Sequence, residues 1–354
     1  MKKYLIMAMA AAAITSCSQD EVMEVAQKQA ISFKDAFVEN ATRAIDATLN
    51  TSNLVNFEVY GNTQGDEKND AGIVTAPIVP IFAGVDVNKS GSDWSYDSKH
   101  IQYWIEGNTY NFAAIALGTS TDATESISVE KGTNGLPATI KYDATNQEDL
   151  LYATQAAIGK ASGNNMVAFT FDHLLSKAMF TVKNTMDSND ANSIYFYRVS
   201  DVKITNAYKA GTYYAVASSN VPEGSWVATI GADDRLEVKF GNVCDETKET
   251  HTTAYEIPMK TSATSHNQQV LIPAEYTDEN PLNITCTIET LIKQDDDYKV
   301  VNIEDYDKNI KHTFAKGQAY NFVISLGDPG EPIEFTVTKV NEWNPATGGT
   351  DVNL

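Results

Sequence analysis

Short segments in which apolar and polar residues alternate run through the chain and constrain its fold more than any other feature. Alternation with a period of two places the apolar side chains on one face of a β-strand. Turn-forming Gly, Asn, Asp and Pro residues separate the segments about every ten residues, a spacing typical of β-sandwiches. The chain is therefore predicted to be all-β. The clearest segments cover residues 55–60, 110–115, 178–182, 237–240 and 333–337.

Helical periodicity is weak, and only two short helices are expected, at residues 146–152 and 303–310. The length of 354 residues allows roughly two domains. Each half of the chain opens with a strand-like segment that a partner strand follows, and a Gly-Asn-Asn turn lies between the halves. We therefore predict two domains, covering residues 44–164 and 165–354.

Residues 1–17 have the order of a bacterial export signal, with a basic start, an apolar run and small residues before a cysteine. The apolar run covers residues 4–14. It is too short to cross a membrane as a helix, which takes about 20 residues. The small residues lead directly into Cys17, an ending that resembles the lipobox of bacterial lipoproteins. Acyl chains on Cys17 would anchor the exported chain, because each buried CH₂ contributes about 0.8 kcal/mol.

Residues 18–43 begin as a polar tether and then become strand-like. Ile31, Phe33 and Phe37 are spaced by two or four positions, so we expect them to share one face of a strand. The segment ends at the Arg43–Ala44 bond, which lies among small residues. A trypsin-like protease can reach such a bond in an extended chain. Proteolytic processing is therefore predicted between these two residues.

Composition and motifs argue against nucleic-acid binding and against catalysis. The formal charge is −21, from 26 basic and 47 acidic residues, and no basic stripe occurs; nucleic acid is therefore not an expected partner. The chain contains no HExxH, CxxC, P-loop, GxSxG or GxGxxG motif. We expect no catalytic residues, no metal site and no cofactor.

Two polar clusters that resemble functional sites have simpler explanations. His173 stands near Asp172 and Ser176, but neighbouring residues of a strand or turn point apart, so a structural histidine is favoured over a catalytic triad. The run at residues 295–297 consists of three aspartates. It lacks the Gly and the terminal Glu of a calcium loop, so an acidic hairpin tip is predicted.

The two cysteines beyond the signal leave two interpretations open. Cys244 and Cys286 could form a disulfide in an oxidising compartment. Alternatively, Cys286 is a buried thiol, because it lies in an alternating run typical of a strand. The sequence does not give the Cα separation that a disulfide requires.

Several motifs in a fixed order resemble the fimbrillin family, the subunits of type V pili of Bacteroidales-type bacteria. The lipoprotein signal and the Ala-Thr-Arg-Ala stretch come first. A Phe-x-His-x-Leu-Ser-Lys strand, an aromatic strand near the end and a final Val-x-x-Trp pattern follow. The resemblance spans the whole chain, and the later motifs are residues 169–182, 202–211, 317–326 and 337–343.

This resemblance implies a fold of two transthyretin-like, Greek-key β-sandwich domains in tandem. It also implies a lipid-anchored outer-membrane precursor that a surface protease of Arg specificity cuts after Arg43. The first strand, within residues 18–43, would then leave a hydrophobic groove, and a terminal strand of another pilus subunit, of the same or a different kind, would fill it. Such a contact does not close on itself and therefore builds a filament.

The strand donated to the next subunit is expected within residues 328–354. Its alternative is an ordinary last strand of its own domain, and both interpretations stay open. Ile333, Phe335 and Val337 are predicted to share one face, because they alternate. The donor candidates are Ile333, Phe335, Val337, Val340 and Trp343.

Two other functions remain open. The chain could be an uncleaved pilus anchor that keeps its lipid on Cys17. It could also be a glycan-binding or adhesive surface lipoprotein, for which exposed aromatic side chains such as Trp94 with Tyr96, and Tyr103 with Trp104, would form a platform. Sandwich cores use the same residue types, and a core role is favoured for these residues.

Overall fold

A computed structural model describes the protein over most of its length. The expectations for Cys17, Arg43, Ala44 and Trp343 lie outside the described residues. Within the described residues no helix is long and apolar enough to cross a membrane. The described residues are 29–38, 49–118, 126–159, 166–186, 195–231, 234–244, 256–265, 268–295, 297–340 and 350–353.

The prediction of an all-β chain is confirmed. The described residues contain strands, turns and two short 3₁₀ helices, η1 (Ser98–His100) and η3 (Ala144–Asn146). The two predicted helices are wrong. Strand β8 (Leu150–Gly159) begins inside the first of them, and the second belongs to β20 (Asp297–Ile310). Both segments form strands because pairing with neighbouring strands satisfies their backbone N–H and C=O groups without a helix.

The first sheet has seven strands in the order β1-β9-β8-β5-β2-β3-β4. Strand β1 lies at one end of this order and runs parallel to β9, whereas the other neighbours are antiparallel. Besides β8, its strands are β1 (Ser32–Val38), β9 (Met166–His173), β5 (Thr109–Leu117), β2 (Asn56–Gln64), β3 (Ile78–Ser90) and β4 (Asp93–Ser95).

The second sheet holds the C-terminal strands. Its order is β15-β16-β10-β22-β23-β24, and β17 also pairs with β10. Strands β10 and β22 are parallel, and β23 is antiparallel to β22. The bounds are β15 (Val243–Cys244), β16 (Thr261–Ser265), β10 (Ser176–Asn184), β17 (Gln269–Leu271), β22 (Ala319–Leu326), β23 (Glu334–Val340) and β24 (Thr350–Asn353).

Smaller sheets complete the fold. One has the order β14-β11-β19-β20, one has the order β13-β12-β7-β6, and a pair consists of β18 and β21. The β19–β20 hairpin turns at residues 294–297, which confirms the predicted acidic hairpin tip. The bounds are β14 (Arg235–Gly241), β11 (Tyr195–Tyr208), β19 (Leu282–Gln294), β13 (Ser225–Ala228), β12 (Ala210–Tyr214), β7 (Pro137–Asp143), β6 (Ile127–Lys131), β18 (Glu275–Tyr276) and β21 (His312–Thr313).

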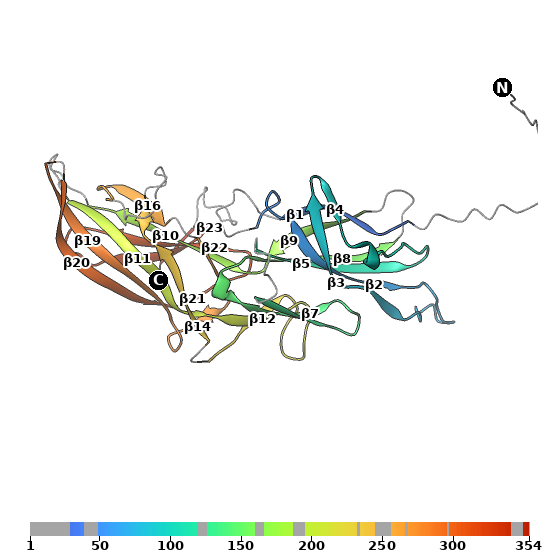
Figure 1. The fold of residues 1–354 in the computed structure, drawn as a ribbon. Helices are drawn as coiled ribbons and strands as arrows, with labels where there is room; N and C mark the ends of the chain where they lie inside the picture. Colours follow the sequence, from blue (N-terminus) through green and yellow to red (C-terminus); the bar gives the residue numbers. More distant parts are fainter. Residues whose placement is uncertain are drawn as a thin grey trace, which may run out of the picture.

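The strands form an elongated molecule with the first sheet at one end and β11, β19 and β20 at the other (Figure 1). Two apolar cores fill it. The first core lies against the first sheet and includes Phe33, Phe112 and Phe169. The second core lies among the later strands and includes Phe180 and Phe322. Strand β5 serves both, because its alternate side chains point to opposite faces: Phe112 lies in the first core and Ala113 in the second.

The division at residue 164 stays a prediction, as does the tandem arrangement of two sandwiches. Strand β9 follows residue 164 in the chain but pairs with β1 and β8 in the first sheet. The chain leaves that sheet only after His173 and enters the second sheet at Ser176. A change-over between these two residues therefore fits the pairing better than one at residue 164.

Candidate functional site

Strand β1 lies at the edge of the first sheet, and this edge is the candidate functional site. Its register with β9 runs in parallel from Ser32 opposite Met166 to Val38 opposite Phe171. Among the described strands, β9 is its only ladder partner. At its end, the Val38 amide donates a hydrogen bond to the Thr51 hydroxyl at 3.0 Å. No described strand pairs with its other edge, although β4 lies nearby.

Hydrogen bonds fix the residues just before β1. The amide of Ile31 donates to the carbonyl of Gln102 at 2.8 Å, and the amide of Trp104 donates to the carbonyl of Gln29 at 2.9 Å. The Tyr96 hydroxyl donates to the carbonyl of Ile31 at 2.6 Å. These bonds hold the entry to β1 against the segment that follows β4, so β1 closes the side of the core that β9 alone would leave open.

Phe33 provides the main side-chain contact between β1 and the first core. Its side chain is 1% exposed. Five aromatic rings surround it with centroid distances between 5.7 and 6.3 Å, and one of them, Phe169 on β9, is stacked on it. Departure of β1 would therefore open an apolar, ring-lined groove. The five rings belong to Phe57, Phe82, Tyr96, Phe112 and Phe169.

The predicted apolar face of β1 is only partly right. Ile31 and Phe33 are buried together, but Phe37 is 51% exposed. The register with β9 shifts between Lys34 and Ala36, which marks a β-bulge. The extra residue reverses the direction of all later side chains. Ala36 and Val38 consequently face the core, and the expectation for Phe37 is wrong.

Strand β9 has a short hydrogen-bonded ladder with the rest of the sheet. Its ladder with β8 covers two residue pairs, His173 opposite Leu151 and the pair before it. One further backbone bond runs from the Leu174 amide to the Leu150 carbonyl at 2.9 Å. From Met166 to Phe171 its described ladder partner is β1. The β1–β9 pair therefore covers the first core as a two-stranded ribbon.

A buried polar cluster, which the sequence analysis missed, lies where β9 meets β8. His173 Nδ1 is 2.9 Å from Asp149 Oδ2, and their side chains are 3% and 0% exposed. The same carboxylate oxygen accepts a hydrogen bond from the Leu49 amide at 3.0 Å. The Ser176 hydroxyl bonds elsewhere, to the Ala315 carbonyl at 2.9 Å. This arrangement agrees with a structural role for His173 and gives it a partner other than Asp172.

Lys177, at the start of β10, adds a second charged group to this region. Its side chain is almost fully buried, at 2% residue exposure. Burial lowers the pKa of its amine to about 8, and the charge of Asp149 opposes that shift. The Phe-x-His-x-Leu-Ser-Lys motif was the available sequence signal for both residues. Asp149 has no such motif, and only the fold brings it to them.

The C-terminal candidates lie in the second sheet. Strand β23 pairs antiparallel with β22 along its whole length and with β24 on its other side. Ile333, Phe335 and Val337 all pack against the second core, which confirms their shared face. The Phe335 and Phe322 rings lie 6.1 Å apart. Val340 faces the opposite side, in a small cluster with Met179 and Ala319.

The two tryptophans predicted for a glycan-binding platform are buried, so they form no exposed surface. Trp94 and Trp104 are 9% and 4% exposed and belong to the first core, and Tyr96 packs against it, which confirms the core interpretation for these three; Tyr103 is 44% exposed. The described cysteine Cys286 is a free, buried thiol on β19. Burial raises the pKa of this thiol to about 12, so it is unreactive. No disulfide to Cys286 forms among the described residues.

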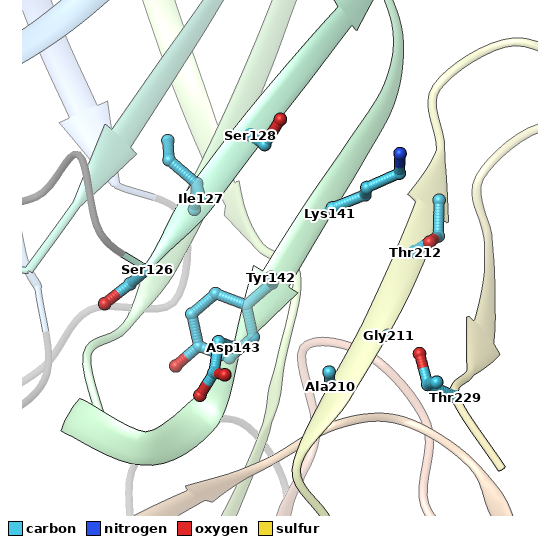
Figure 2. A pocket seen from close by; sticks show the side chains of 10 residues that line it. All are labelled: Ser126, Ile127, Ser128, Lys141, Tyr142, Asp143, Ala210, Gly211, Thr212 and Thr229. Carbon is cyan, nitrogen blue, oxygen red and sulfur yellow. The ribbon is translucent and has the colours of Figure 1, made fainter. Parts of the chain in front are cut away.

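A shallow hollow of about 450 Å³ lies on the sheet of β6, β7 and β12 (Figure 2). Ser128, Lys141 and Thr212 face one another across these strands. The Lys141 amine is held by Glu130 at 2.6 Å, and the Tyr142 hydroxyl donates to the Glu148 carbonyl at 2.5 Å. The described residues contain no cluster of metal-ligating side chains, here or elsewhere. The remaining lining residues are Ser126, Ile127, Asp143, Ala210, Gly211 and Thr229.

Comparisons with known proteins agree with this architecture. The family model described as fimbrillin-like matches residues 42–343. A solved fimbrial protein from Bacteroides vulgatus aligns with 90% of this chain and 100% of its own, at 16% identity and a TM-score of 0.60.

Two other solved structures have lower structural similarity. Both carry provisional cell-adhesion names, and they come from Bacteroides ovatus (17% identity, 89% of this chain and 96% of its own, TM-score 0.46) and Bacteroides uniformis (15% identity, 90% and 99%, TM-score 0.46). No curated protein matches the chain significantly.

Proposed function

The chain belongs to the fimbrillin-like family, and from that premise we propose that it is a structural subunit of a type V pilus that contributes to adhesion and biofilm formation. It reaches the outer membrane as a precursor with a lipid on Cys17. A surface protease of Arg specificity cuts it after Arg43, and it then polymerises with other pilus subunits by strand exchange. The single observation that carries this proposal is the edge position of β1, with Phe33 filling a ring-lined groove.

The distribution of arginines supports cleavage at one place. The chain has three arginines, Arg43, Arg198 and Arg235. Arg198 lies in β11 and bonds to Glu289 at 2.9 Å. Arg235 lies in β14 and bonds to the Asn206 carbonyl at 3.1 Å. Proteases need an extended chain that they can bind, which a paired strand does not offer, so Arg43 is the arginine we assign to processing.

The donor strand is proposed to be β23 with the residue before it. Ile31 and Phe33 have the same spacing as Ile333 and Phe335. Val38 and Val340 also follow at equal distances in sequence, but Val340 faces the other side of its strand. The match runs in the same chain direction, so a donor in this register would keep the parallel pairing with β9. Phe335 would then enter the ring-lined groove that Phe33 leaves. Backbone pairing supplies affinity, and the matching side chains supply specificity.

An assembly assay tests the proposal. The chain from residue 18 to 354 is treated with an Arg-specific protease, and the products are examined by mass spectrometry and by SDS electrophoresis without heating. We expect one cut, after Arg43, followed by a ladder of SDS-resistant polymers. The Arg43→Ala variant should stay uncut and monomeric. A chain that is cut after Arg43 and remains monomeric contradicts strand exchange, and a chain that resists cutting supports a permanent anchor on Cys17.

A second variant pair tests the donor. Phe335→Asp should abolish the ladder after cutting, because a carboxylate cannot enter the ring-lined groove without a large desolvation cost. Phe37→Asp is its matched control, since that aromatic side chain is 51% exposed and leaves with the cut segment. Unchanged polymerisation of Phe335→Asp would exclude β23 as the donor and would point to the chain beyond residue 340.

A further inference from the structure

We propose that Asp149 and His173 form a clamp that holds β9 in place while the groove is empty, between the loss of β1 and the arrival of the next strand. This inference rests on the proposed function and adds two positioning residues to it. Neither residue lies on β1 or on β23. Their role is to keep the acceptor strand ready for a donor.

The need for a clamp follows from how β9 is paired. Its ladder with β1 covers Met166 to Phe171, and its ladder with β8 covers the last two residues, ending at His173. Once β1 departs, the backbone of β9 keeps bonds only at that end among those described. Phe169 also loses its stacked neighbour, Phe33. Phe169 and Phe171 keep their contacts with Phe57, but a strand whose backbone is paired at one end alone opens more easily than a fully paired one.

The clamp lies at the anchored end and survives the cut. Asp149 directly precedes β8, and His173 ends β9, so their 2.9 Å contact joins the two strands by side chains where the ladder is shortest. The Leu49 amide, 3.0 Å from the same carboxylate oxygen, belongs to the chain after Arg43. The contact therefore joins three segments that all remain in the processed subunit.

Burial makes the loss of either partner of this contact costly. Both side chains are at most 3% exposed. Removing one partner of a buried polar pair leaves the other without compensation. Lys177 lies close enough for its charge to interact with Asp149, so the carboxylate sits in a polar node rather than alone in an apolar core.

Hydrogen exchange on the intact chain tests the clamp without a protease. The full chain from residue 18 is compared with Ile31→Ala, which loosens β1, with Asp149→Ala, and with both changes together. We expect each single variant to raise amide exchange in residues 167–171 about tenfold, and the pair to raise it by clearly more than the product of the two. Simple multiplication of the two effects would overturn the proposal, because β1 and the clamp would then hold β9 independently.

Two further variants separate positioning from general stability. Asp149→Asn keeps one acceptor oxygen and should restore part of the protection in β9. Asn184→Ala is the matched control: its side chain is also buried and bonds to the Ile257 carbonyl at 2.9 Å, in the second core. We expect it to lower the melting temperature without raising exchange in β9. If Asn184→Ala raised amide exchange in β9 as much as Asp149→Ala does, the Asp149–His173 contact would be an ordinary stabilising contact and the proposal would fail.

The assembly assay then connects the clamp to function. After cutting at Arg43, Asp149→Ala should form polymers about tenfold more slowly than the parent chain, with cutting itself unchanged. Normal polymerisation of a variant whose β9 exchanges quickly would show that the clamp is not needed for assembly. If the parent chain does not polymerise, the proposed function fails, while the exchange experiment still decides whether the clamp exists.

Discussion

Strands β1 and β23, each with the isoleucine before it, share an Ile-x-Phe spacing in sequence but are held in opposite ways. Strand β1 has one described ladder partner, which is parallel, and its stability comes from Phe33 in the ring-lined groove. Strand β23 has a ladder on both sides, with seven residue pairs to β22, and its Phe335 is only half-buried. One strand is held mainly by side chains and the other mainly by its backbone.

This difference suits a strand that leaves and a strand that replaces it. Parallel pairing is slightly less stable per residue than antiparallel pairing, so β1 gives up less backbone stability per residue pair than an antiparallel strand would. It leaves a groove of defined shape, which favours a donor with the same side chains. Strand β23 must separate from β22 before it can pair with β9 of another subunit, and we expect that step to limit the rate of assembly.

The largest expected effect concerns the two phenylalanines. Phe33→Ala should lower the free energy of unfolding by about 3–5 kcal/mol, the usual cost of removing a fully buried aromatic side chain. Phe335→Ala should cost about 1 kcal/mol, because its ring is half-buried. Denaturant unfolding of the uncut chain, followed by circular dichroism, measures both. Equal costs would contradict the proposed difference between a strand held by side chains and one held by its backbone.

A pH series on Lys177 gives the next largest effect and probes the junction between the two sheets. Its pKa is lowered from 10.5 to about 8 by burial, so the unfolded chain binds more protons than the folded one between these values. Stability from this group therefore rises with pH through the window and is lost as pH falls towards 8. Relative to Lys177→Met, the parent chain should gain about 2 kcal/mol between pH 7.5 and pH 10.

The comparison with Lys177→Met isolates this one group. Cys286 and several buried tyrosines have raised pKa values, and their titration destabilises both proteins alike at high pH. A difference in unfolding free energy that stays constant across the series would show that the Lys177 amine is not neutralised near pH 8. It would also remove the reason to regard the node around Asp149 as strongly desolvated.

Two tyrosines offer a matched pair with a smaller effect. The Tyr96 hydroxyl bonds to the Ile31 carbonyl at 2.6 Å, just before β1, and the Tyr197 hydroxyl bonds to the Gly327 carbonyl at 2.7 Å, ahead of β23. Each change to Phe should cost about 1 kcal/mol. Only Tyr96→Phe should speed cutting at Arg43, because it loosens β1. Faster cutting in both variants would mean that the C-terminal segment also restrains the cleavage site.

Sequence patterns predicted the elements that depend on local periodicity. Alternation identified the all-β class. It correctly placed Ile31 and Phe33 on one buried face, and Ile333, Phe335 and Val337 on another. The predicted helix at residues 303–310 failed because β20 lies at the edge of its sheet and is exposed along most of its length. Without a buried face, a strand shows no period of two.

Long-range features had no local signal. Asp149 meets His173 because β8 and β9 join there, and nothing in either neighbourhood marks them as partners. The bulge between Lys34 and Ala36 was equally hidden, since an inserted residue changes pairing without changing composition. The residues on which both proposals rest are brought together by such long-range features. The motifs were therefore sufficient to indicate the family, whereas the site could be found only from the fold.

The smallest effect tests that bulge directly. Phe37→Ser should change the free energy of unfolding by less than about 0.5 kcal/mol, because the side chain is 51% exposed and surface substitutions rarely do more. It should also reduce aggregation of the uncut chain, since it removes an exposed ring next to an open strand edge. Denaturant unfolding and light scattering measure the two outcomes. A loss comparable with that of Phe33→Ala would place both rings on one face and contradict the bulge.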